Sequence, residues 1–205
     1  MKQFLTLFLV FFTLSTITNA QNYGQELLQE LNATRNMVED NPKDKALNLK
    51  AGSLSFQFSN YLNDANQIEK AQKYIYDAEY YHLKALEIDS MYFDALSSYG
   101  SFNYNLSMVD YDNRLNLPVK YKTKYKELTE TTNFRLQKAH SMFVRAESIN
   151  PNDIDIIISF QEIYAVTMKS DLNQEYVNRR KQKEESSETT FTAYDKHPSS
   201  SELEL

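Results

Sequence analysis

The chain has 205 residues, with three glycines, four prolines, no cysteine and a formal net charge of −6. The absence of cysteine excludes disulfides, thiolate catalysis and cysteine-based metal sites. Three glycines are too few for a phosphate-cradling loop or for the turns of a many-stranded β fold. The mild acidic balance disfavours nucleic acid and gives no reason to expect adhesion to anionic lipid. Few helix breakers and this length predict one largely helical domain.

Residues 1–20 predict a secretory signal peptide. Lys2 precedes an apolar run over 4–14, which is shorter than the roughly 20 residues that a membrane-spanning helix needs. Small residues then lead to Ala20, after which cleavage is expected. The mature chain would begin at Gln21, carry no membrane span and be periplasmic or secreted. An uncleaved membrane anchor is the alternative.

The remaining chain predicts seven consecutive helices, because apolar residues recur at spacings of three and four. The segment 44–62 also alternates like a strand, but a strand of that length would be unusual. The isoleucine run 154–158 has strand propensity, but the helix cap in front of it favours a helix. The predicted helices cover residues 24–39, 44–62, 66–88, 92–106, 118–148, a segment that starts after Asp153, and 172–185.

Two segments are expected to lack helical structure or to interrupt it. A polar link is predicted at 110–114, between the fourth and fifth helices. Serine-rich residues without an apolar pattern predict a disordered tail over 187–205. The helical domain is therefore expected to span 21–186. Within it, the long fifth helix should bury one face, made of Tyr121, Tyr125, Leu128, Thr132, Leu136, Ala139, Phe143 and Ala146.

One spacing in the long helix resembles a family. Ala139, Phe143, Ala146 and Pro151 stand as in the second helix and closing turn of a tetratricopeptide (TPR) repeat. The spacing recurs, with departures, at Ala78, His82, Ala85 and Ser90. A motif that resembles the first helix of a repeat is formed by Leu96, Tyr99 and Gly100. The narrower likeness is to small exported TPR-like proteins of Gram-negative bacteria. The resemblance implies an all-α fold of stacked antiparallel helix hairpins, a TPR-like α-solenoid.

The chain departs from this pattern between Gly100 and Ala139. These positions are 39 residues apart, whereas a 34-residue repeat separates them by about a dozen. About 27 residues are therefore inserted, and we expect them mostly as an N-terminal extension of the long helix. Glycine inside a helix is unfavourable by about 1 kcal/mol relative to alanine. Close contact with a neighbouring helix would explain Gly100 and, less directly, Gly52.

The sequence predicts no enzyme, no cofactor and no metal site. His82 lies on an apolar helical face and is expected to be an interior histidine, whereas His140 is expected on the surface and His197 in the tail. No zinc-protease histidine pair or glycine-flanked serine occurs. Two carboxylate pairs offer oxygen ligands for calcium: Asp110 with Asp112, and Asp153 with Asp155. Neither pair resembles a full oxygen-ligand loop, and helix capping explains Asp153 better.

Four lysines alternate with two tyrosines at the start of the long helix: Lys120, Lys122, Lys124 and Lys126 with Tyr121 and Tyr125. Basic side chains beside stacking aromatics are typical of single-stranded nucleic-acid sites. The sequence favours a solvated helix face instead, because both tyrosines are expected on the buried face and Glu127 and Glu130 follow.

The expected function is binding of a protein or peptide partner. Stacked hairpins use the concave side, lined by their first helices, for recognition. Tyrosines cluster in one helix pair at Tyr74, Tyr80, Tyr81, Tyr92, Tyr99 and Tyr104, and most are expected in the core. The predicted partner-binding residues are Asp94, Ser97, Ser101, Tyr104, Asp155 and Glu162. The alternative is a structural or homo-oligomeric component of a cell-envelope assembly.

Overall fold

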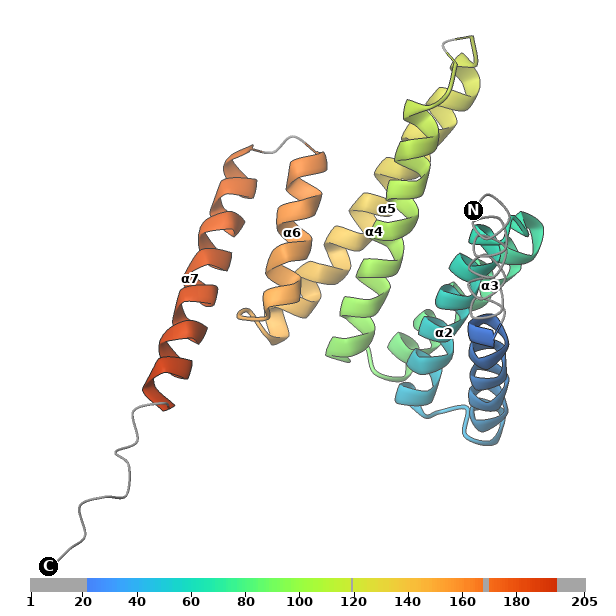
Figure 1. Cartoon of the computed structure of the whole chain (residues 1–205), viewed down its shortest axis with the longest axis horizontal. Coiled ribbons are helices and arrows are strands. Elements are labelled where there is room, and N and C mark those ends of the chain that lie inside the picture. Colours follow the sequence, from blue (N-terminus) through green and yellow to red (C-terminus); the bar gives the residue numbers. More distant parts are fainter. Residues whose placement is uncertain (1–21, 119, 168–169, 195–205) are drawn as a thin grey trace, which may run out of the picture. The chain divides into compact units, whose positions relative to one another are not determined.

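The computed structural model describes residues 22–118, 120–167 and 170–194. The predicted signal peptide, residues 1–20, lies outside these ranges. A first helix covers residues 22–40. The elements that follow are α2 (Lys45–Asp64), α3 (Ile68–Ile88), α4 (Phe93–Leu115), α5 (Lys122–Ile149), α6 (Ile154–Val166) and α7 (Ser170–Tyr194) (Figure 1). The seven helices in the described part of the chain confirm the predicted all-α fold.

The helices pack as adjacent hairpins within two compact units, Met1–Tyr99 and Gly100–Leu205. In the first unit α2 packs against α3, and in the second unit α6 packs against α7, each pair in antiparallel order (Figure 1). The boundary between the units falls within α4. The chain therefore has a repeat-like fold of helix hairpins, as the sequence predicted.

Aspartate caps explain why two ambiguous segments are helical. The Asp44 carboxylate accepts hydrogen bonds from the backbone N–H groups of Ala46 and Leu47 and begins α2. Asp153 does the same for α6, accepting from Asp155 and Ile156 at 3.1 Å. Because such caps satisfy N–H groups that a helix otherwise leaves unpaired, they favour helix over the strand that local propensity allows.

The core of the first unit joins its first three helices. Its buried side chains are Leu27, Leu31, Leu54, Phe58, Leu62 and Ala71. Beside this cluster, Arg35 forms an ion pair with Asp77 of α3 at 2.7 Å and donates to Ser55 of α2 at 3.3 Å. Hydrophobic burial supplies most of the driving force here, while Arg35 fixes how these helices sit against one another.

His82 of α3 is an interior residue, as predicted, with 1% of its surface exposed. Its Nδ1 lies 2.7 Å from the Ala78 carbonyl, and its Nε2 lies 2.9 Å from the Ser98 hydroxyl. A Cβ atom at Gly52 would lie 2.7 Å from Nδ1. Glycine at position 52 therefore leaves room for the imidazole, which explains a helical glycine that the sequence accounted for only weakly.

In the second unit, α5 buries most of the predicted face. Leu128, Thr132, Leu136, Ala139, Phe143 and Ala146 are all buried. The prediction is wrong at the N-terminal end of this face, where Tyr121 and Tyr125 are 49% and 50% exposed. Helical periodicity continues past the last packing neighbour, so it overestimates burial at helix ends.

The inserted residues are divided between two helices. The predicted polar link at 110–114 is helical, because α4 continues to Leu115, and α5 begins at Lys122. The expectation that the insertion mostly lengthens the start of α5 is therefore wrong. Arg135 of α5 donates to the Leu106 carbonyl at 3.2 Å and pairs with Asp110 at 3.0 Å, which ties the two lengthened helices together.

The last helix extends beyond its predicted end at residue 185. α7 covers Ser170–Tyr194 and so includes residues 187–194, which the sequence assigned to the tail. Residues 195–205, with His197, lie outside the described residues. Within α7, Arg179 forms an ion pair with Glu147 of α5 and donates to the Pro151 carbonyl at 2.8 Å.

Candidate functional site

The structure brings two predicted site residues together in the second unit. The half-buried Tyr104 of α4 donates a hydrogen bond to the carboxylate of Glu162 on α6. Burial of the phenol, followed by the charge of Glu162, raises the pKa of Tyr104 to about 12. The hydroxyl therefore stays protonated and remains a donor throughout the neutral range. These two side chains join the first helices of two consecutive hairpins.

Two further predicted residues lie on the same helices. Asp155 is exposed in the first turn of α6, and Ser101 is half-buried one turn before Tyr104 on α4. Asp155 and Glu162 are seven residues apart, so both lie on one side of α6, about 10 Å apart along its axis. Among the described residues neither carboxylate forms an ion pair. Ser101, Tyr104, Asp155 and Glu162 are termed the α4–α6 surface below.

Asp94 and Ser97 belong to the first unit. Asp94 forms a hydrogen bond with Tyr92. The Lys45 ammonium lies 4.5 Å from the centre of the Tyr92 ring. The same ammonium forms an ion pair with Asp89 at 2.5 Å. Ser97 is half-buried one turn after Asp94. Asp94 thus takes part in the contacts that hold the start of α2 against the turn before α4.

The tyrosine cluster is divided between core and surface. Tyr99 is buried and donates to Glu79 at 2.9 Å, whereas Tyr80 is 56% exposed. Tyr74, Tyr81, Tyr92 and Tyr104 are half-buried. The expectation that most of these rings lie in the core is confirmed only for Tyr99, and Tyr104 combines partial burial with a polar end.

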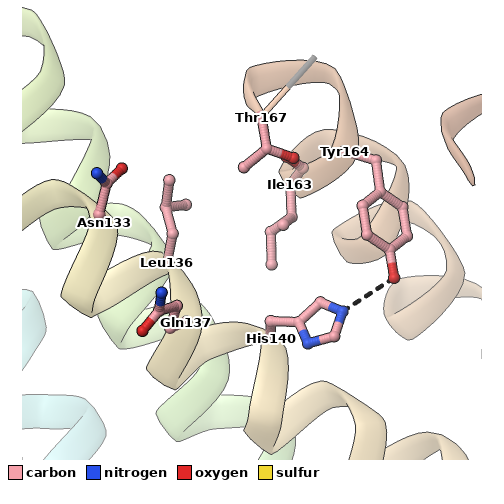
Figure 2. Close-up of a pocket in the computed structure, with 7 residues that line it drawn as sticks. All are labelled: Asn133, Leu136, Gln137, His140, Ile163, Tyr164 and Thr167. Atoms are coloured by element: carbon pink, nitrogen blue, oxygen red, sulfur yellow. Dashed lines mark hydrogen bonds between the residues drawn. The ribbon is translucent and has the colours of Figure 1, made fainter. Parts of the chain in front are cut away.

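A pocket of about 300 Å³ opens between α5 and α6 of the second unit (Figure 2). Leu136 and Ile163 supply apolar walls. The remaining lining residues are polar: Asn133, Gln137, His140, Tyr164 and Thr167. Pockets of this size are at the small end of those that hold ligands. Because its lining carries amides, hydroxyls and one imidazole, the pocket suits an uncharged polar group better than an ion.

One hydrogen bond organises this pocket. Nε2 of His140 lies 2.9 Å from the Tyr164 hydroxyl, and the two side chains meet across the pocket in Figure 2. The imidazole also packs edge-on against Phe160. Burial raises the pKa of Tyr164, with Glu147 and Glu175 adding to the shift. The pairing of His140 with Tyr164 fixes both polar side chains on the pocket wall, where they can form hydrogen bonds with a bound group.

Sequence reasoning did not identify this pocket. Asn133, Gln137 and His140 recur at spacings of four and three on α5, which places them on one side of the helix. All three side chains are polar, so they do not contribute to the apolar periodicity from which helix faces were predicted. That they face Tyr164 and Thr167 depends on the register between α5 and α6, which no local pattern specifies.

The described residues contain no cluster of three or more histidine, aspartate or glutamate side chains that could hold a metal ion. In the same part of the chain, no helix combines the length and the apolar character needed to cross a bilayer. Comparisons with protein-family models, with curated proteins and with solved structures found no significant match.

Proposed function

We propose that this protein is an exported, TPR-like scaffold that binds a protein or peptide partner without catalysing a reaction. The observation that supports it best is the Tyr104–Glu162 pair, which presents an aromatic ring and a carboxylate side by side at the edge of two neighbouring helices. Tyrosine at such a position offers contact area at low entropic cost.

The charges of the α4–α6 surface favour a partner segment with basic side chains. Asp155 and Glu162 are exposed carboxylates without an ion-pair partner among the described residues. A lysine or arginine side chain of a bound peptide would form a charge-assisted hydrogen bond with Glu162. Tyr104 already donates to that carboxylate and would hold it in place.

Selection from a library of random displayed peptides tests this proposal. Peptides that bind the purified protein are expected to be enriched in lysine and arginine. Their affinity should fall at least tenfold in the Tyr104→Ala, Glu162→Ala double variant, because a buried aromatic contact and a charged hydrogen bond are each worth about 1–3 kcal/mol.

The matched control replaces the same residue types elsewhere. Tyr23 and Glu26 are both exposed on the first helix, so Tyr23→Ala with Glu26→Ala should leave peptide affinity unchanged. Selected peptides that bind the Tyr104/Glu162 variant as tightly as the wild type would exclude the α4–α6 surface as the site.

The second candidate, a structural component of a cell-envelope assembly, is favoured by a different observation. Tyr76, Tyr80 and Leu83 are 64%, 56% and 46% exposed on α3. Their spacings of four and three align them along one side of the helix. Large apolar side chains grouped in this way are more typical of an interface than of a solvated face.

A further inference from the structure

The connection between α4 and α5 has an unusual composition. Residues 113–126, termed the hairpin tip below, contain five basic side chains and no acidic one, although the whole chain has a net charge of −6. Its described residues, 113–118 and 120–126, include the end of α4 and the first residues of α5. A positive segment is thus concentrated at one end of the α4–α5 hairpin of an acidic protein (Figure 1).

The hairpin tip also exposes large apolar side chains. Leu115 is 62% exposed, and Tyr121 and Tyr125 are 49% and 50% exposed. The interpretation of this segment as an ordinary solvated face assumed that both tyrosines were buried against neighbouring helices. Since they are not, lysines, tyrosines and Leu115 are all exposed within this short stretch of the hairpin.

Nearby carboxylates neutralise only part of this charge. Glu127 and Glu130 pair with Lys124 and Lys126, at 2.9 Å and 3.7 Å. Asp110, whose carboxylate also feels the charge of Lys124, forms an ion pair with Arg135 of α5. In the described part of the chain, no carboxylate forms an ion pair with the remaining three basic residues, Arg114, Lys120 and Lys122.

The aromatic rings of the tip lie beside its cations. The Lys120 ammonium is 5.1 Å from the centre of the Tyr121 ring. The Arg114 guanidinium is 4.6 Å from the Tyr111 ring and 5.7 Å from the Tyr125 ring. These cation–π contacts keep cationic groups and phenol rings next to one another in the tip.

We propose that the hairpin tip docks onto the surface of an anionic lipid bilayer. Leu115 and the rings of Tyr121 and Tyr125 would enter the headgroup region, where tyrosine is enriched because its ring is apolar and its hydroxyl polar. Lysine and arginine keep their charges at the phosphates while their methylene chains cover apolar surface. Each basic residue near an anionic surface strengthens binding about fivefold.

The exposed leucine favours lipid over nucleic acid. A single-stranded nucleic acid would use the lysines and stack its bases on the tyrosines. It would gain little from Leu115, whose side chain has no aromatic face and no hydrogen-bonding group. A bilayer surface accounts for the basic, aromatic and aliphatic side chains together.

The absence of cysteine allows a local test in the full chain. Thr123→Cys, labelled with a polarity-sensitive fluorophore, places the only thiol within the tip. On mixing with vesicles of equimolar phosphatidylcholine and phosphatidylglycerol, its emission should rise and shift to shorter wavelength. Vesicles of phosphatidylcholine alone should give little change. Binding through any other segment would leave this probe in water.

Substitutions in the tip separate charge from apolar insertion. Lys120→Gln with Lys122→Gln should raise the vesicle concentration for half-maximal response about 25-fold. For the wild type, added salt should also raise this concentration. Leu115→Ser with Tyr121→Ser should abolish the spectral shift. The matched control, Lys43→Gln with Lys73→Gln, removes two exposed lysines from the first unit and should change nothing.

A second label checks that the response is local. Ser141→Cys, exposed on α5 outside the tip, should show no shift with either vesicle. An unchanged tip probe with anionic vesicles would overturn the proposal. So would a tip probe that responds to a single-stranded oligonucleotide and to no vesicle.

Discussion

At the scale of single residues, His82 is held in its neutral form. The Ala78 carbonyl can only accept a hydrogen bond, so Nδ1, 2.7 Å away, carries the proton. Nε2 then accepts from the Ser98 hydroxyl at 2.9 Å. Burial lowers the pKa of His82, although the bond to Ala78 and the charge of Glu79 oppose this shift. Folding therefore excludes a proton that the unfolded chain would bind.

This linkage predicts loss of stability in mild acid. Because the pKa of His82 is lower in the folded chain, the free energy of unfolding is greatest above about pH 6.5 and falls below it, by at most about 1.4 kcal/mol per pH unit. Urea unfolding between about pH 7.5 and about pH 5.5 should show a smaller loss for His82→Gln than for the wild type.

The variant serves as its own control at higher pH. Above about pH 7.5 the histidine is neutral in both the folded and the unfolded chain, so wild type and variant should show parallel pH dependence there. Equal losses of stability in mild acid would contradict the proposed burial of a neutral imidazole.

At the scale of elements, Gly100 sets how closely α4 and α5 pack. A Cβ atom at this position would lie 2.6 Å from Cε1 of Phe143, which is buried on α5. The ring belongs to the buried face of α5 and has little room to move. The absence of a side chain on Gly100 is therefore what allows Phe143 its place in the core.

Gly100→Ala should destabilise the protein. Overpacking a core by one methyl group costs about 1–3 kcal/mol, which exceeds the gain of about 1 kcal/mol from the better helix propensity of alanine. A net loss of about 1 kcal/mol in the free energy of unfolding is expected from urea titration. An increase in stability would show that the helices separate without strain.

A double-mutant cycle assigns the loss to this contact. Phe143→Leu removes ring atoms that face position 100, so Gly100→Ala should cost less in that background. Residues in contact show coupling energies of about 0.5–3 kcal/mol. Additive effects of the two substitutions would place the origin of the loss elsewhere.

At the scale of the whole molecule, the proposals assign different surfaces to different partners. The α4–α6 surface carries two carboxylates that form no ion pair within the described residues, whereas the hairpin tip is basic and aromatic. The net charge of −6 describes neither surface. It disfavours anionic partners only on average, and local segregation of charge determines what each region attracts.

The assembly hypothesis predicts self-association of the whole protein. If the exposed residues of α3 form an interface, sedimentation should show a dimer whose population rises with concentration. Tyr76→Ser with Tyr80→Ser should then yield a monomer, because the variant removes most of the apolar area. A wild-type monomer at every concentration would contradict the hypothesis and leave the peptide-binding proposal standing.

The sequence by itself determined the helices, most of their buried faces and their order. Helical spacing, aspartate caps and scarce breakers act within a few residues, so they are readable along the chain. The same information predicted His82 as interior and Gly100 as a close contact, both of which the structure confirms.

Only the tertiary structure decided where each helix has a neighbour. It showed that Tyr121 and Tyr125 are exposed, that α4 shares the insertion with α5, and that His140 meets Tyr164. It also joined Tyr104 to Glu162, 58 positions apart in the chain. Periodicity specifies which side of a helix is apolar, but burial and pairing depend on the length and register of a partner distant in sequence.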